Sequence, residues 1–428
     1  MNPLLIIPTY VSARSQAKIA PVAETYDHMT PLQSPGELAR CLKSLMHVQG
    51  VGQIAVLVVS ETQVAAQAAR KVRAICEQFP LLNTIVIGQV EESLIKQRFK
   101  QLNLTGLDEA ISLHGYSAMR NLGLIVAGVF GFDSVVFIDD DEVVDDSEFL
   151  VKGMYGLGKL TRRGIPILAK SGYFLDKEGS VHSKRQDRWY DRFWMQGSAF
   201  NRWIDSALRG PRLSRSNHVC GGCLALHREA YRRVCFDPWI VRGEDLDYLL
   251  NLRMYGSDIW FDNQWHLRHL PPKTPSEGLR FRQDIYRWIY EFRKMEYSRT
   301  QIDLQQIKPS SLEPYPGPLL EPGITKRIKR TALLRSLARP DKAAYRRAAR
   351  VATSEATVYA ERCCSKYFEF QFIWPEAMHR IEDDGALRDA LLQHATVGSD
   401  TSTRPVTDDQ VGRIDPGATS EIRLNMAD

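Results

Sequence analysis

Apolar segments of strand length alternate with segments of helical pattern through the first third of the chain, and this alternation constrains the fold most. The strand-like runs are Leu4–Ile7, Ile54–Val59, Thr84–Gly88 and Ser134–Ile138, and the helical patterns are Pro35–Val48, Thr62–Phe79 and Tyr116–Phe130. Strands that are apolar throughout and separated by helices predict a parallel sheet with helices on both faces. Right-handed crossovers make this an open, doubly wound sheet, in which ligands bind at the carboxyl ends of the strands.

The pattern changes after about residue 160. Further strands are expected at Ile165–Lys170, Cys220–His227 and Ile259–Phe261, and helices at Arg228–Val234, Glu244–Tyr255 and Ser276–Ser298. A Pro-rich stretch then marks a boundary. We therefore expect a sheet-containing unit over residues 1–305, a linker over 306–323, a basic and mostly helical extension over 324–394, and a polar, disordered tail over 395–428.

Composition excludes several classes of protein. With 428 residues, 44% hydrophobic and 25% charged, the chain is neither collagen-like, mucin-like nor wholly disordered. No apolar run approaches the roughly 20 residues of a transmembrane helix, and no signal peptide is recognisable at the start. Seven cysteines, an odd and sparse set, predict a reducing, cytoplasmic location. A net charge of +5 argues against a dedicated nucleic-acid binder.

An acidic run is the most informative stretch. Four carboxylates, Asp139, Asp140, Asp141 and Glu142, directly follow a buried strand. Such crowding costs Coulomb energy unless a cation neutralises it. Oxygen ligands of this kind suit Mg²⁺ or Mn²⁺, often completed by substrate phosphates. Asp139 and Asp141 lie two apart and so point the same way, one towards a nucleotide and one towards the metal. The alternative is an acidic loop or helix cap.

Four stretches carry a resemblance to a known family. They are Leu4–Tyr10, Arg120–Gly123, Asp139–Asp141, and Gly243–Asp245 with Arg253 and Gly256 downstream. In this order, over roughly residues 4–275, they resemble the motifs of GT-A-fold glycosyltransferases, closest to the family 2-like group that uses nucleotide-diphosphate sugars. The resemblance implies an α/β GT-A fold, with a Rossmann-like, doubly wound and mostly parallel sheet, here followed by a helical C-terminal extension.

The resemblance also implies an activity, the transfer of a sugar from a nucleotide-diphosphate donor, UDP- or GDP-linked, to a hydroxyl acceptor. Asp139 and Asp141 would hold Mn²⁺ or Mg²⁺, with His269 as a further ligand; His266 faces the opposite side of an extended strand. Asp245 is the expected base, with Glu244 as its alternate, because a helix N-terminus keeps an acid ionised. Inversion is favoured, and retention stays open.

A set of residues is expected to contact the donor: Pro8, Thr9, Tyr10, Arg14, Glu61, Arg120, Asp139, Asp140, Gly221 and Gly222. Glu61 stands where the family usually has a base- or ribose-contacting acid, but Val-Ser-Glu departs from the usual Val-Asp and leaves the base open. Arg120 would hold a phosphate or brace Asp139. Arg268 or Lys273 is an alternative contact to the diphosphate. The glycine pair lets backbone approach the donor sugar; zinc at the flanking cysteines is not expected, because no second cysteine pair exists.

Two further segments suggest partners. Arg185–Arg215, rich in tryptophan and arginine, would bind a sugar or anionic acceptor, or would pack on the core. Thr325–Arg350 holds ten basic residues and one acid. It would lie on an anionic membrane, at its inner face, or dock on the acidic remainder of the chain. Rival functions are a nucleotidyltransferase, although Pro8–Ser12 lacks the glycine-rich loop such enzymes need, and a membrane- or polyanion-binding protein.

Overall fold

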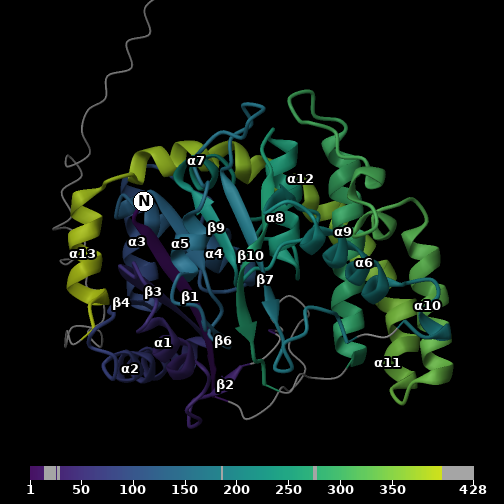
Figure 1. Cartoon of the computed structure of the whole chain (residues 1–428), viewed down its shortest axis with the longest axis horizontal. Helices are drawn as coiled ribbons and strands as arrows, with labels where there is room; N and C mark the ends of the chain where they lie inside the picture. Colours follow the sequence, from purple (N-terminus) through teal and green to yellow (C-terminus); the bar gives the residue numbers. More distant parts are fainter. Residues whose placement is uncertain (14–25, 27–28, 185–186, 273–276, 398–428) are drawn as a thin grey trace, which may run out of the picture.

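The computed structural model describes residues 1–13, 26, 29–184, 187–272 and 277–397. These residues build a mixed sheet of ten strands with helices on both sides (Figure 1). The main path of the sheet runs β4-β3-β1-β5-β9-β7-β10-β6, with β2 added beside β1 and β8 beside β10. The predicted tail lies outside the described residues from position 398 onward.

The strands are β1 (Pro3–Ser12), β2 (Thr30–Pro31), β3 (Gln53–Ser60), β4 (Asn83–Ile87), β5 (Ser134–Phe137), β6 (Glu142–Val143), β7 (Ala169–Leu175), β8 (Leu213–Arg215), β9 (Leu224–His227) and β10 (Ile259–His269). The α-helices are α1 (Leu38–Leu45), α2 (Ala65–Cys76), α3 (Gln89–Gln101), α4 (Tyr116–Val129), α5 (Phe149–Met154), α6 (Gln196–Arg209), α7 (Arg228–Arg233), α8 (Glu244–Met254), α9 (Glu277–Ser298), α10 (Ile324–Ala338), α11 (Lys342–Arg347), α12 (Thr353–Ile381) and α13 (Gly385–Ala395). Short helical turns complete the set: η2 (Thr62–Val64), η3 (Trp189–Asp191), η4 (Pro309–Leu312), η5 (Gly317–Leu319) and the π-turn η6 (Ala348–Ala352).

The first half of the sheet is parallel, as the sequence predicts. β1 pairs in parallel with β3 on one side and β5 on the other, and β3 pairs in parallel with β4. Every residue of β1 is buried, which its unbroken apolar sequence requires. Gly123 of α4 faces the Ile6 side chain, and a Cβ there would lie 3.1 Å from it, so glycine allows the helix to pack closely on the sheet.

The second half of the sheet is mixed: β10 runs parallel to β7, but antiparallel pairs stand on both sides of these two strands, so the expected mostly parallel sheet is confirmed only in part. β9 runs antiparallel to both β5 and β7, and β10 runs antiparallel to β6 and β8. An apolar run such as that of β9 carries no signal of its direction, because buried parallel and antiparallel strands bury the same residues. The reversal brings the amino end of β9, rather than its carboxyl end, to the edge where β1 and β5 end.

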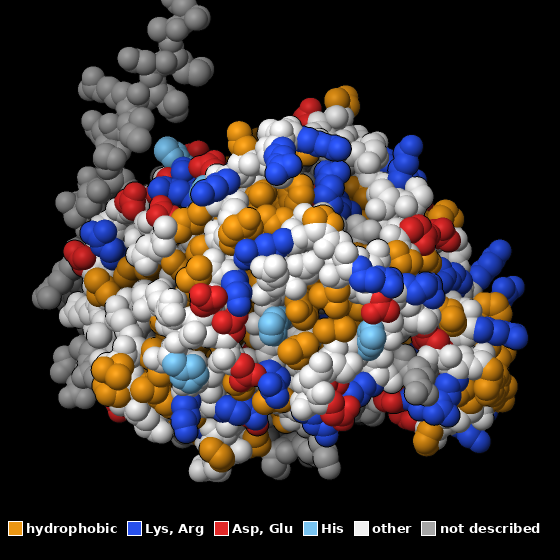
Figure 2. Space-filling model, in the orientation of Figure 1, with side chains coloured by type: hydrophobic (Ala, Val, Ile, Leu, Met, Phe, Trp, Pro, Cys, Tyr) orange, Lys and Arg blue, Asp and Glu red, His pale blue; other side chains and the backbone are white. Residues whose placement is uncertain are grey.

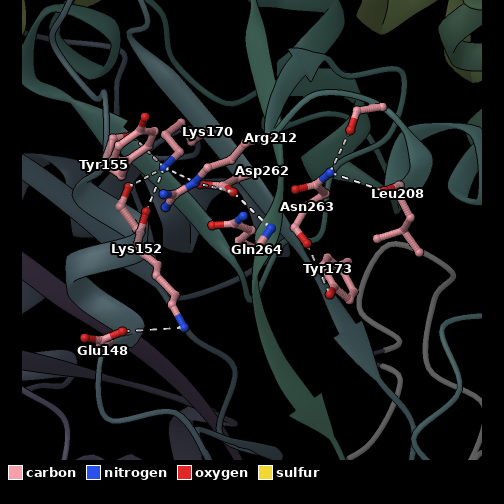
Figure 3. A network of polar contacts seen from close by, with 12 residues as sticks. Glu148, Lys152, Tyr155, Lys170, Tyr173, Leu208, Arg212, Asp262, Asn263 and Gln264 are labelled. Atoms are coloured by element: carbon pink, nitrogen blue, oxygen red, sulfur yellow. Dashed lines mark hydrogen bonds and ion pairs between the residues drawn. The ribbon is translucent and has the colours of Figure 1, made fainter.

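A buried lysine anchors the long strand β10 (Figure 3). The Lys170 ammonium on β7 pairs with Asp262 of β10 at 2.9 Å, and both side chains are fully buried. The same ammonium donates to the carbonyls of Lys152, Gly153 and Tyr155, at the end of α5. One cation thus satisfies a buried carboxylate and the open carbonyls of a helix end, which fixes β7, β10 and α5 to one another.

The last helices return across the molecule to its N-terminal half. α9, α10 and α11 lie together at the right of Figure 1, and α12 crosses the top to reach α13 beside α3. Arg73 of α2 donates to the carbonyls of His394, Ala395 and Thr396. Among the described residues, no helix is both long and apolar enough to cross a membrane.

Candidate functional site

Five chain segments converge at one edge of the sheet. The carboxyl ends of β1 and β5 meet there, and the reversed β9 brings its preceding loop, with Gly221 and Gly222, to the same edge. The start of α8 and the end of β10 complete the arrangement. Ligands of open α/β sheets bind at this edge, so the fold gathers most of the predicted site residues where chemistry is expected.

The acidic run leaves β5 with its carboxylates in different settings. The Asp139 side chain is 36% exposed, while that of Asp141 is 1% exposed. Asp140 is buried and accepts a hydrogen bond from the Thr9 hydroxyl at 2.6 Å. Glu142 turns back and accepts the Asp139 backbone N–H at 2.8 Å. The run is therefore a folded turn with Asp139 as its accessible carboxylate, rather than a solvated acidic loop.

His269 lies against Asp141, with the imidazole Nε2 and a carboxylate oxygen 3.1 Å apart. The pairing of β10 with β6 sets this contact, since it places His269 opposite Glu142. The Arg40 guanidinium on α1 supports the strand end, donating to the Leu270 carbonyl at 2.9 Å. His266 is turned elsewhere and stacks on Tyr173, with ring centroids 5.2 Å apart.

Arg120 of α4 links the two acidic motifs. Its guanidinium lies 3.6 Å from Asp139, 3.1 Å from Glu244 and 3.0 Å from the Gly221 carbonyl. Burial alone would lower the pKa of Arg120, but Glu244 and Asp139 raise it, so the cation is permanent. Burial raises the pKa of Asp139 to about 6; Arg120 opposes this rise and Asp141 adds to it. The site thus holds one fixed cation amid an excess of carboxylates.

The two acids at the start of α8 differ in their partners. Glu244 is buried and committed to Arg120. The Asp245 side chain is 23% exposed, with Arg287 of α9 at 4.0 Å. Gly243 precedes them with φ at 78°, and a side chain there would collide with the Arg287 guanidinium. Of the two, Asp245 is therefore the one with a carboxylate free to meet a substrate.

The two glycines before β9, Gly221 and Gly222, pack closely against the charged side chains of the site. A Cβ on Gly221 would lie 2.7 Å from the Arg120 guanidinium and 3.4 Å from the Cβ of Asp245. A Cβ on Gly222 would collide with the Glu142 carboxylate. Burial, with Asp139 and Asp141 nearby, raises the pKa of Glu142 well above its usual range. Both positions need glycine because the charged groups of the site occupy the space a side chain would take.

Aromatic rings line the site beside β1. Tyr10 packs against Tyr26 at 4.5 Å and against Tyr116 at 5.8 Å between ring centroids. Pro8 lies within the same strand. Glu61 accepts hydrogen bonds from the Ser12 hydroxyl and the Ala13 N–H, so it braces the end of β1. Arg14 lies outside the described residues.

A small recess opens beside Glu61, at the carboxyl ends of β3 and β4. The residues that line it are Val58, Ser60, Thr62, Ala65, Gly88, Gln89, Glu92, Leu113 and His114.

Several predicted residues lie away from this centre. Arg268 pairs with Asp145 at 2.7 Å, and Lys273 lies outside the described residues. In the predicted acceptor segment, Trp194 and Trp203 are buried, which confirms core packing for these two rings. All seven cysteines are free and buried.

The sequence interpretation gave no role to Tyr26, Tyr116 or Arg287, and it named Glu142 only as one of the four crowded carboxylates. Tyr116 stands four residues before Arg120, one helical turn away, and that spacing is a signal that could have found it. Arg287 comes from a helix more than forty residues beyond Asp245, and no local pattern connects the two.

Of the three predicted metal ligands, Asp141 and His269 contact each other, and Asp139 lies nearby in the same acidic run. Among the residues that the structure describes, no group of three or more His, Cys, Asp or Glu side chains could hold a metal ion. Asp141 and His269 are in contact, while Asp139 pairs with Arg120. Mg²⁺ and Mn²⁺ suit carboxylate oxygens and are commonly held by one or two carboxylates and substrate phosphates. The donor set fits such an ion when a phosphorylated ligand completes it.

Comparisons with known proteins find a likeness among solved structures alone. No protein-family model matches the chain, and no curated protein matches it. A solved structure of a mannosyltransferase from Pyrobaculum calidifontis, in complex with GDP-Man and Mn²⁺, is similar with a TM-score of 0.45 and 14% identity, covering 88% of this chain and 86% of that one. A likeness of this degree assigns neither a family nor an activity.

Proposed function

We propose that this chain is a glycosyltransferase of the GT-A type, moving a sugar from a nucleotide-diphosphate donor to a hydroxyl acceptor. The observation that carries the proposal is the 3.1 Å contact between His269 and Asp141. It joins residues 128 positions apart at the sheet edge where Arg120 links Asp139 to Glu244. This contact, the Thr9–Asp140 hydrogen bond and the Arg120 pairs support the proposal that the scattered motifs serve one site.

Each group has a role that its surroundings support. Asp141 and His269, with Asp139 on the donor side, would hold Mn²⁺ or Mg²⁺, which when bound neutralises charge on the leaving diphosphate. Arg120 is a permanent cation close enough to stabilise the same charge. The tyrosines around Tyr10 offer rings for the base to stack on.

Asp245 acts as the base. The acceptor hydroxyl attacks the anomeric carbon and gives its proton to the Asp245 carboxylate. The bond from the anomeric carbon to the diphosphate oxygen breaks, and its electron pair stays on the phosphate. A single displacement of this kind inverts the anomeric centre. Asp245 suits this role better than Glu244, because Glu244 is buried and paired with Arg120.

Donor binding tests the proposal without knowledge of the acceptor. A ligand that binds only the native state raises its melting temperature, so the chain is screened with Mn²⁺ and UDP-, GDP-, CMP- or dTDP-sugars. We expect one donor class to stabilise the protein in a Mn²⁺-dependent way. Asp141→Asn should abolish that shift. Asp145→Asn, an exposed acid in the same segment that pairs with Arg268, should keep it.

The base is tested on the donor class so identified. Asp245→Asn should keep the melting shift but slow Mn²⁺-dependent donor turnover about 100-fold or more, the usual contribution of a general base. A donor shift unchanged in Asp141→Asn, or full turnover in Asp245→Asn, would refute the assignment of these residues.

A further inference from the structure

The outward face of α10 is basic and apolar at once. Its exposed residues recur at helical spacing along one face: Lys326, Lys329, Arg330, Leu333 and Leu337. Leu333 and Leu337 are each 60% exposed, one turn apart, and no acid stands between the cations and the leucines on this face. Cations and exposed leucines on one face are the pattern of a basic amphipathic helix.

The following helix extends the same surface. α11 packs against α10, and the exposed cations Lys342, Arg346, Arg347 and Arg350 follow in and just after it. Within the described part of the chain, none of these four, nor the three cations on α10, pairs with a carboxylate. Figure 2 shows lysine and arginine side chains beside hydrophobic ones along the right edge, where Figure 1 places these helices. We call this surface, formed by Lys326, Lys329, Arg330, Leu333, Leu337, Lys342, Arg346, Arg347 and Arg350, the basic face.

Other arginines of the same segment point inward and fix the basic face in place. Arg335 pairs with Asp191 at 2.7 Å, Arg339 pairs with Glu277, and Arg327 donates to the Phe193 carbonyl at 3.0 Å. The segment therefore uses part of its charge to dock on the rest of the chain. Arg330 of the basic face also lies over the Phe193 ring, 5.2 Å from its centroid. No such docking contact is seen, within the described residues, for the remaining cations of the basic face.

An exposed tryptophan stands next to these helices. Trp189 of η3 is 60% exposed, and η3 packs directly against α10 through the Asp191–Arg335 pair. Tryptophan prefers the boundary between lipid headgroups and hydrocarbon, where its ring is apolar and its N–H stays wet. A surface for nucleic acid or another polyanion would need the cations but would gain little from two leucines.

We propose that the basic face docks the protein on an anionic lipid bilayer. The lysines and arginines would lie at the lipid phosphates, and Leu333, Leu337 and Trp189 would enter the boundary between headgroups and acyl chains. The inference rests on the surface of α10, α11 and the adjoining turns η3 and η6, so it does not depend on the proposed transferase activity.

Co-sedimentation of the full chain with lipid vesicles tests the docking. The wild-type protein should bind vesicles of phosphatidylcholine mixed with phosphatidylglycerol and should not bind vesicles of phosphatidylcholine only. Binding to the mixed vesicles should weaken as the salt concentration rises. Lys329→Glu combined with Arg330→Glu should weaken binding about 25-fold or more, since each basic residue near the surface contributes about a factor of five. Leu333→Ser combined with Leu337→Ser should weaken it about tenfold or more.

Matched variants elsewhere on the surface complete the design. Arg162→Glu with Arg163→Glu makes the same charge change in the loop before β7, and Leu81→Ser with Leu160→Ser removes two exposed leucines elsewhere. Both should bind as the wild type does, and thermal melts should show all variants folded. The proposal fails if the wild type does not bind anionic vesicles. It also fails if the control double variants weaken binding as much as the double variants of the basic face do. It also fails if heparin displaces the protein while the leucine variant binds unchanged, which would identify a polyanion site.

Discussion

At the scale of single residues, His218 shows how the site's surroundings set a protonation state. Its imidazole is packed among the rings of Phe200, Trp203 and Tyr315, with centroids 4.9, 5.5 and 6.0 Å away. Burial lowers the pKa of His218 to about 4; Asp245 opposes this and Arg287 reinforces it. The imidazole is neutral in the folded protein at pH values where an unfolded chain would already be protonated.

This difference predicts an acid-sensitive stability. Between pH 6.5 and about 4 the unfolded chain binds a proton at His218 that the folded chain does not, so the free energy of unfolding falls as pH falls. The slope is about 1.4 kcal/mol per pH unit, and the total is at most about 3 kcal/mol. Urea unfolding at several pH values should show that His218→Gln removes the contribution of His218 and so lowers the slope by up to about 1.4 kcal/mol per pH unit. His379→Gln, at an exposed residue of α12, should leave the slope unchanged. Equal slopes of unfolding free energy against pH in the wild type and in His218→Gln would contradict this prediction.

The residues of the candidate site fall into two groups: those in short sequence motifs and those that distant segments bring to the site. Asp139, Asp141, Glu244 and Asp245 stand in short motifs, and the pattern of each motif predicts them. Arg287 and Tyr26 reach the site only because distant segments pack together, which a local pattern does not report. The roles proposed for the motif residues stay predictions until the variants are measured.

At the scale of elements, the interior of each apolar segment was easier to predict than its end. β1 was expected to end at Pro8, but it continues to Ser12. Its pairing with β5 ends at Ile6, and beyond that point β1 continues beside β3, so the missing N–H of Pro8 falls outside the β5 pairing. The strand expected at Ile165–Lys170 begins instead at Ala169, and α3 was not predicted at all.

The start of α13 depends on one carboxylate with two tasks. Asp384 accepts the Leu387 N–H as the helix cap and pairs with Arg98 of α3 at 2.7 Å, with both side chains fully buried. Asp384→Ala would leave the Arg98 cation buried and one N–H uncapped, so we expect a loss of about 3–5 kcal/mol of stability. Urea unfolding should show this loss, while Asp389→Ala, 78% exposed on the same helix, should change stability by less than about 0.5 kcal/mol. A small effect of Asp384→Ala would mean that the pair adds nothing to the docking of α13.

At the scale of the whole molecule, the helical extension shares the core of the sheet-containing unit. Buried side chains of α10, α12 and α13 belong to the same continuous cluster as Leu4 and Ile6 of β1. Gln371 of α12 donates to the Arg233 carbonyl at 2.6 Å, and Trp374 donates to the Tyr231 carbonyl at 2.8 Å. The sequence suggested a boundary at its Pro-rich stretch, but proline and glycine mark only where a chain turns, and the contacts of α12 with α7 and α4 are formed far from that stretch.

A shared core predicts that the extension and the sheet unfold together. Trp374 is fully buried, so Trp374→Ala should cost about 3–5 kcal/mol through lost burial and the cavity left behind. Phe372→Ala, at a ring 87% exposed on the same helix, should cost almost nothing. In urea, helix content by circular dichroism and tryptophan fluorescence should fall in one transition that Trp374→Ala moves as a whole. If Trp374→Ala instead moved only an early loss of helix and left a second transition in place, the helices after the linker would be a separately folding unit, as the sequence division at 306–323 implies.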